Sequence, residues 1–259
     1  AQSTNDNSKF VPIVFCLLPN KRASTYKIVF ESLKRYVKKG PEPFLIDFEM
    51  GVKTEFEPQF PETVLRGCYF HLVYNILKQV KKKGGQVDLR NNISFSIAIG
   101  HMKALAFLPS DQVTAAYESI VQPMLLDSVA NKKMVISVCN YLEHTYMGKR
   151  HTRKNTTVPL FPPSMWSHHQ TVLGDSVRVL TNNSQECFNR VWNNKLAKSP
   201  NVGSVIASFQ REARSMSDTL REFRTYCPEN HNAKRKKQNV RYNQISKILQ
   251  RLNAGNTSI

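Results

Sequence analysis

The stretch that decides the fold runs from residue 44 to residue 71 and contains FLIDFEM (44–50) and VLRGCYFH (64–71). Each part holds a short apolar run, which is typical of a strand buried on both faces. Asp47 directly follows the first run, and the second run leads through Cys68 and His71 into a helix. Because α/β proteins place their chemistry at the carboxyl ends of strands, the stretch predicts two core strands with a candidate site at their ends.

The chain around this stretch alternates strands with helices. Residues 10–18 contain the run VPIVFCLL and predict a buried strand. Helical spacing of apolar residues predicts one helix over residues 24–39 and another from His71 to the glycines at 84–85. Together with the stretch above, this order predicts an α/β layout.

After Gly85 the pattern becomes helical. From residue 89 to 147 the spacing predicts three helices and no strand, and the basic, proline-punctuated segment 148–163 predicts a loop. Cap residues at 181–183 predict the start of a helix that holds Glu186. A last long amphipathic helix is predicted from Ser199-Pro200 onward.

Positive charge is the strongest feature of the composition. The chain has 37 Lys and Arg against 19 Asp and Glu, a formal net charge of +18. Such a balance suggests a polyanionic partner, most often nucleic acid, although any single basic cluster can also be a solvated face. No apolar stretch is long enough to span a membrane. The five scattered cysteines do not suggest a disulfide framework, which favours a reducing compartment.

Two acids are candidate ligands for divalent cations, Asp47 on a strand end and Glu186 near a helix start. Enzymes that cut phosphodiesters hold two cations ~4 Å apart with carboxylates from different elements, and hard oxygen ligands suit magnesium. An ordinary surface role is the alternative for both acids. Glu49 is interpreted as a charge at a helix N-terminus, where the helix dipole stabilises it.

Six blocks carry a resemblance to a known family: VPIVFCLLPNKRASTY, FLIDFE, GCYFH, ALAFLPSDQV, FPPSMW and TNNSQECFN, in this order. Over residues 10–225 the sequence resembles the transposase core of Mutator-like elements (MULEs). The resemblance implies an α/β ribonuclease H-like (DDE transposase) core with an all-α insertion, and Mg²⁺ or Mn²⁺ as cofactor. It makes Asp47 the second catalytic acid and Glu186 the third. Cys68 and His71 correspond to the Cys-x-x-His signature of the family.

One part of the family pattern is missing. The first catalytic acid of the family lies in a segment resembling D-G-T-F, and nothing upstream of Val11 matches it. The sequence therefore resembles a fragment that lacks the first strands of the core, and this chain alone is expected not to cleave DNA and to be poorly soluble. The expected parts are an N-terminal part of the ribonuclease H-like core, an α-helical insertion, the C-terminal core helices and a basic tail, at residues 10–85, 86–180, 181–225 and 226–259.

The function implied by the resemblance is that of a DNA transposase catalytic domain. Its reaction is metal-dependent phosphodiester hydrolysis and strand transfer at transposon ends. The partners are transposon-end and target DNA, with further copies of the chain in a synaptic complex, and the location is the nucleus. A domesticated or decayed derivative that binds DNA without catalysis is the alternative. A plain basic interaction domain is a third interpretation.

Several residues have two interpretations. Cys68 and His71 are either half of a zinc site or a buried thiol and a hydrogen-bonded histidine that orient the active-site strand. Trp166 either stacks on a flipped base or packs in the core. His168 and His169 are expected at the surface. Beside Trp166, the candidates for contact with DNA are Arg190 and the tail residues Lys234, Arg235, Lys236 and Lys237.

Overall fold

The structure, a computed structural model, describes residues 12–148, 150–152, 155–174, 180–226, 240 and 243–251. The chain forms two compact units, and each is described here by itself. The larger unit is Asn20–Thr181, and the smaller unit combines Ala1–Pro19 with Asn182–Ile259. The four parts expected from the sequence stay a prediction.

The larger unit begins with a small α/β part, and its two strands lie where the sequence predicts them. The strands pair in parallel with Phe44 opposite Leu65 and Ile46 opposite Gly67. Parallel strands need a crossover connection, which α2 supplies. The elements of this part are α1 (Ala23–Tyr36), β1 (Phe44–Ile46), α2 (Met50–Phe56), β2 (Leu65–Gly67) and α3 (Tyr69–Lys82).

Aromatic rings pack this small sheet against its helices. The ring of Phe44 stacks on that of Phe56 at a centroid distance of 4.2 Å, and Phe30 from α1 meets Phe56 edge-on at 5.2 Å. On α3, Leu72, Ile76 and Val80 are fully buried. Their spacing of four residues places them on one face of the helix, as the sequence predicts.

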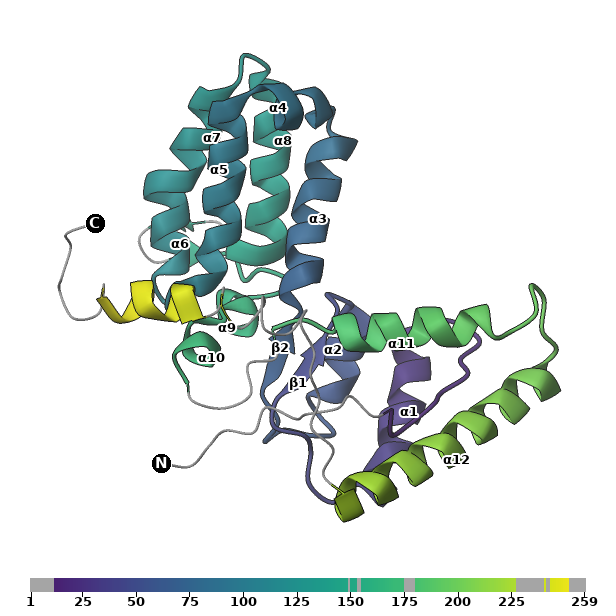
Figure 1. The fold of residues 1–259 in the computed structure, drawn as a ribbon. Helices are drawn as coiled ribbons and strands as arrows, with labels where there is room; N and C mark the ends of the chain where they lie inside the picture. Colours follow the sequence, from purple (N-terminus) through teal and green to yellow (C-terminus); the bar gives the residue numbers. More distant parts are fainter. Residues whose placement is uncertain are drawn as a thin grey trace. The chain divides into compact units, whose positions relative to one another are not determined.

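The second part of the larger unit is helical. Figure 1 shows α3 running from the sheet into a group of helices that includes α5, α7 and α8, with α8 next to α3. The elements that follow α3 are α4 (Gln86–Asn91), α5 (Ile93–Ala104), η1 (Leu105–Phe107), α6 (Val113–Ala116), η2 (Tyr117–Val121), α7 (Gln122–Ser128), α8 (Lys132–Leu142) and η3 (Glu143–Met147). The three predicted helices correspond to α5, to the continuous stretch α6–η2–α7 and to α8 with η3, whereas the short α4 and η1 were not predicted. The π-helical turn η2 lies within a longer helix, and the π-helical turn η3 ends one. The turn η2 ends at Val121, two residues before Pro123, which has no N–H for the helical ladder.

Residues 148–163 are not entirely a loop, which corrects the sequence-based prediction. Strands β3 (Arg150–Thr152) and β4 (Asn155–Thr156) pair antiparallel, with Arg150 opposite Thr156. Threonine is β-branched and favours strands, whereas the prediction rested on the charge and the prolines of the segment. The short helices α9 (Pro163–Trp166) and α10 (His169–Leu173) follow.

The smaller unit contains α11 (Asn183–Asn194), α12 (Val202–Tyr226) and the helical residues 243–251. Trp192 of α11 stacks on Phe209 of α12 at 4.8 Å, and its Nε1 donates to Ser208 Oγ at 2.9 Å. Phe15 also stacks on Phe209, at 5.0 Å. These rings hold the two helices and the N-terminal segment together.

The strand predicted over residues 10–18 is wrong for residues 12–18, which form no strand. Apolar sequence makes a strand only where another strand offers hydrogen bonds, and none of the described segments pairs with this one. Ile13 is 90% exposed, so the segment is not buried as expected. Its contact with the unit runs through Phe15 instead.

The described residues are thus mostly helical, with a small parallel sheet of β1 and β2. This is compatible with an α/β transposase fragment, whereas the ribonuclease H-like arrangement stays a prediction. None of the helices in the described part of the chain has the length and apolar character that crossing a membrane requires.

Candidate metal site at the ends of β1 and β2

The backbone brings the two strand ends together. Asp47 directly follows β1, and Cys68 directly follows β2. The N–H of Cys68 donates to the carbonyl of Ile46 at 2.9 Å, so the parallel pairing continues one residue beyond the strands. Cys68 is also the N-cap of α3, and His71 lies three residues later on the same side of its first turn.

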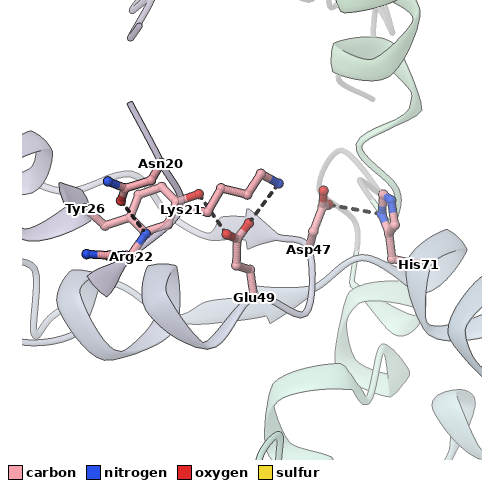
Figure 2. A network of polar contacts seen from close by, with 7 residues as sticks. All are labelled: Asn20, Lys21, Arg22, Tyr26, Asp47, Glu49 and His71. Atoms are coloured by element: carbon pink, nitrogen blue, oxygen red, sulfur yellow. Dashed lines mark hydrogen bonds and ion pairs between the residues drawn. The ribbon is translucent and has the colours of Figure 1, made fainter. Parts of the chain in front are cut away.

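The three side chains converge. His71 Nδ1 lies 3.0 Å from Asp47 Oδ1, and Figure 2 shows the two side chains pointing toward each other. One ligand atom each from Asp47, Cys68 and His71 lies within 4.8 Å of the others. The Asp47 side chain is 49% exposed and that of His71 is 19% exposed, whereas Cys68 is fully buried. A carboxylate, a thiol and an imidazole therefore share one partly open site.

This group can hold a divalent metal ion. All three side chains are common metal ligands, and the donor atoms are close enough for small rotations to bring them onto one ion. Asp47 supplies the hard oxygen that Mg²⁺ or Mn²⁺ prefers, but Cys68 and His71 do not. Within this group of described residues, Asp47 is thus the one ligand that suits a hard cation such as Mg²⁺ or Mn²⁺.

Glu49 takes part in a separate polar network. It is the N-cap of α2, which confirms the predicted position at a helix start. Its carboxylate accepts a hydrogen bond from the Tyr26 hydroxyl at 2.8 Å and pairs with Lys21 at 3.6 Å (Figure 2). Burial and the Glu49 carboxylate raise the pKa of Tyr26 to about 12. Glu49 therefore links α1 to α2.

Glu186 lies in the first turn of α11, where its N–H donates to the carbonyl of Asn182 at 3.1 Å. The predicted helix start is confirmed by this position. Glu186 belongs to the smaller unit and Asp47 to the larger. That the two acids share a metal cluster therefore stays a prediction.

Trp166 is fully buried in the larger unit. Its Nε1 donates to the carbonyls of Tyr146 and Phe161, at 3.3 and 3.2 Å. This environment supports core packing, the second of the two interpretations. Contact with a DNA base would require the ring to leave the core.

The expectation that His168 and His169 lie at the surface is wrong. Their residues are 1% and 6% exposed. A histidine can be buried in its neutral form, which the polarity of the residue type does not reveal. Burial and the neighbouring Arg66 guanidinium lower the pKa of His168 to about 4, against an opposing interaction with the Gly67 backbone.

Sequence reasoning missed Arg66 altogether. From β2, its Nη1 donates to the carbonyls of Ser164 and Ser167, at 3.3 and 3.1 Å. These two hydrogen bonds connect β2 with α9 and with the residue that follows it. An arginine within a short apolar strand is the one signal that could have indicated such a role.

Among the candidates for DNA contact, Arg190 is exposed on α11, and its Nη2 lies 3.9 Å from Cys187 Sγ. Lys234, Arg235, Lys236 and Lys237 lie outside the described residues. Their role stays a prediction from charge.

One comparison with known proteins gives a match. Residues 1–75 match the family model described as MULE transposase domain. No curated protein and no solved structure matches the chain. The matched range includes Asp47, Cys68 and His71 and ends before Glu186. The match supports the assignment that the sequence blocks predicted, and a transposase family implies DNA binding and use of a divalent metal.

Proposed function

We propose, from the match of residues 1–75 to the MULE transposase domain, that the chain is part of a transposase catalytic domain that cuts phosphodiester bonds at transposon ends. Asp47 and Glu186 are the proposed ligands of Mg²⁺ or Mn²⁺. The observation that carries the proposal is the position of Asp47, at the carboxyl end of a parallel strand within the matched range and beside His71.

Asp47 has the surroundings that such a role needs. Its carboxylate is half exposed, so a cation and a phosphate can reach it, and the contact with His71 fixes its orientation. A bound divalent cation would activate the attacking oxygen and stabilise the leaving one. One carboxylate cannot hold two cations, and Glu186 is therefore proposed as a further ligand.

The rest of the chain supplies contact with DNA. A net charge of +18 favours binding to the phosphate backbone of either transposon-end or target DNA. The proposal includes a ribonuclease H-like arrangement of the intact core, strand transfer after hydrolysis, a nuclear location and a synaptic complex with several copies of the chain.

A second candidate function is DNA binding without cleavage, by a domesticated or decayed derivative. The observation in its favour is the donor set around Asp47, where the neighbouring ligands are a thiol and an imidazole rather than further carboxylates. Binding through basic side chains does not depend on this site.

Nicking of supercoiled plasmid DNA tests the proposal. The full-length gene product is incubated with Mg²⁺ or Mn²⁺ and compared with its Asp47→Asn and Glu186→Gln variants. We expect nicking by the unaltered protein and a loss of at least about 1,000-fold in each variant, as for catalytic groups in general. Asp111→Asn is the matched control, since it removes the same charge from an exposed position in the larger unit.

DNA binding, measured by fluorescence anisotropy on the same proteins, separates the two candidate functions. If all the proteins bind DNA tightly and none of them shows metal-dependent nicking, the second candidate function, DNA binding without cleavage, is favoured. Nicking that persists in Asp47→Asn would contradict the proposed role of this carboxylate.

A further inference from the structure

We propose that Asp47, Cys68 and His71 form a three-ligand site for Zn²⁺, with the fourth position of the ion left to water. The inference does not rest on the proposed function, because it concerns metal binding by the larger unit in the absence of DNA. A Zn²⁺ ion at this site does compete with that function for the Asp47 carboxylate.

The distances between the donor atoms suit one small ion. Zn²⁺ binds nitrogen and oxygen at about 2.0 Å and sulfur at about 2.3 Å, so tetrahedral ligand atoms lie roughly 3.3 to 3.8 Å apart. In the structure, the donor atoms of the three residues lie within 4.8 Å of one another, and His71 Nδ1 is 3.0 Å from Asp47 Oδ1. Side-chain rotations that move atoms by about 1 Å would bring all three onto one ion.

The backbone fixes the positions from which these side chains project. Two paired strands end side by side at Asp47 and Cys68, and the N–H of Cys68 is bonded to Ile46. The carbonyl of Cys68 accepts from the N–H of Leu72 at 3.0 Å, which fixes the helical turn that carries His71. Leu72 is itself fully buried. The site is therefore largely formed before a metal binds.

The donor chemistry selects the metal. Thiolate and imidazole ligands favour Zn²⁺ over Mg²⁺, which prefers oxygen. A carboxylate and a thiolate bring two negative charges, which one Zn²⁺ ion balances. This balance matters at Cys68, which is fully buried, because a buried charge is costly without a partner. The amino end of α3 also favours an anion at this position.

The exposure of Asp47 indicates that the fourth coordination position of the Zn²⁺ ion is open to water. Asp47 reaches solvent with a side chain that is 49% exposed, whereas His71 Nδ1 is itself buried. Within the described part of the chain, the group contains no further His, Cys, Asp or Glu. Three protein ligands and one open position are typical of zinc sites that bind water or a substrate oxygen, whereas structural sites have four protein ligands. Zn²⁺ in this site would also occupy the carboxylate that the proposed function assigns to Mg²⁺ or Mn²⁺.

Cobalt substitution tests the inference, since Co²⁺ replaces Zn²⁺ and absorbs visible light. The reduced 259-residue chain is titrated with Co²⁺ without DNA, and Zn²⁺ is then added in competition. We expect one Co²⁺ per chain, with the strong visible bands of four-coordinate cobalt and a thiolate-to-cobalt charge-transfer band, and displacement of both by Zn²⁺. Cys68→Ser should abolish the charge-transfer band and weaken Co²⁺ binding by at least about 100-fold, since even outer-shell changes cost 10- to 100-fold.

His71→Gln removes a second ligand of the same site, which lies on α3. It should weaken Co²⁺ binding by a similar factor and keep the thiolate band at saturating Co²⁺. The control is Cys139→Ser, which alters another buried thiol of the larger unit and should leave the spectrum unchanged. Circular dichroism without metal shows whether each variant is folded.

A thiolate band that is absent from the folded wild-type chain would overturn the inference. A band that survives Cys68→Ser but is lost in Cys139→Ser would overturn it too. Failure of the nicking assay together with normal cobalt binding would reject the proposed function and leave the zinc site standing.

Discussion

A single buried side chain, Trp166, joins three segments of the larger unit. Its ring is fully buried and meets Tyr146 edge-on at a centroid distance of 6.3 Å. Its Nε1 satisfies the backbone carbonyls of Tyr146 and Phe161. Removing the ring would therefore leave a cavity and also two carbonyls without this donor.

We expect Trp166→Ala to lower the free energy of unfolding by about 3 to 5 kcal/mol, because large aromatic residues in a core leave large cavities. Trp166→Phe keeps an apolar ring but removes the donor, and should cost about 1 to 3 kcal/mol. Urea denaturation followed by circular dichroism measures both. Tyr36→Ala, at a position 86% exposed, should change stability by less than about 0.5 kcal/mol. Equal effects of Trp166→Ala and Tyr36→Ala would contradict the buried position.

His168 makes a pH-dependent contribution to stability. Its pKa falls from 6.5 to about 4 on folding. Between these values the unfolded chain binds a proton at this position and the folded chain does not, so stability is complete above pH 6.5 and is lost as the pH falls toward 4. The loss from this group between pH 7 and pH 5 should be roughly 2 kcal/mol.

Urea denaturation at pH 7 and at pH 5 measures this effect. His168→Gln should show a smaller loss of stability between the two pH values than the wild-type chain. His101→Gln, which alters an exposed histidine, should keep the wild-type pH dependence. A His168→Gln variant with the full wild-type dependence would show that other groups cause it.

At the scale of the elements, Gly67 at the end of β2 controls how closely the sheet packs. A Cβ at this position would lie 2.5 Å from Cζ of Phe48. Phe48 cannot easily move, because its ring is held edge-on against Tyr146 and Phe161, at 5.2 and 5.1 Å. The residue after Gly67 is Cys68, so a shift of the strand would also move the candidate metal site.

Gly67→Ala should therefore destabilise the chain by about 1 to 3 kcal/mol, as overpacking does elsewhere. It should also weaken Co²⁺ binding. Gly100→Ala in α5 is the matched control, since its Cβ would meet nothing within 4 Å and alanine favours a helix by up to about 1 kcal/mol. Thermal unfolding with and without Co²⁺ measures both variants. Normal cobalt affinity in Gly67→Ala would show that the site tolerates movement of β2.

The elements also show which features the sequence could predict. β1 and α3 were predictable because each has a clear local pattern, an apolar run in one and a spacing of four in the other, although Phe44 and Leu45 of β1 are only partly buried. The segment 12–18 has an equally apolar pattern but no partner strand in the described residues, and a pattern cannot reveal a missing partner. Asp47, Cys68 and His71 were predictable as a group because parallel strand ends share one edge of a sheet. The contact of Tyr26 with Glu49 depends on how α1 packs against α2, which no local spacing encodes.

At the scale of the whole molecule, the charge of +18 should dominate contact with DNA. Affinity for duplex DNA should fall steeply with salt, with little sequence preference. Replacing Lys234, Arg235, Lys236 and Lys237 by Gln should reduce the slope of log K against log salt by up to about 3.6, or about 0.9 for each lost phosphate contact. Fluorescence anisotropy at several salt concentrations measures the slope.

Replacing Lys81, Lys82 and Lys83 by Gln removes a similar cluster from the body of the chain. The slope of log K against log salt for this variant shows whether the body of the chain contacts DNA in addition to the tail. An unchanged slope in the tail variant would exclude these four residues as phosphate contacts.

The hydrogen bonds of Arg66 have a consequence for the order in which the protein is made. Its two carbonyl partners lie 98 and 101 residues further along the chain. At about 5 to 20 residues per second, a ribosome needs roughly 5 to 20 seconds to reach them after it has made β2. The backbone hydrogen bonds within the helices in between join residues four apart and form quickly, whereas contacts between distant residues form slowly. During synthesis, Arg66 therefore cannot form these two hydrogen bonds until the helical part has left the ribosome.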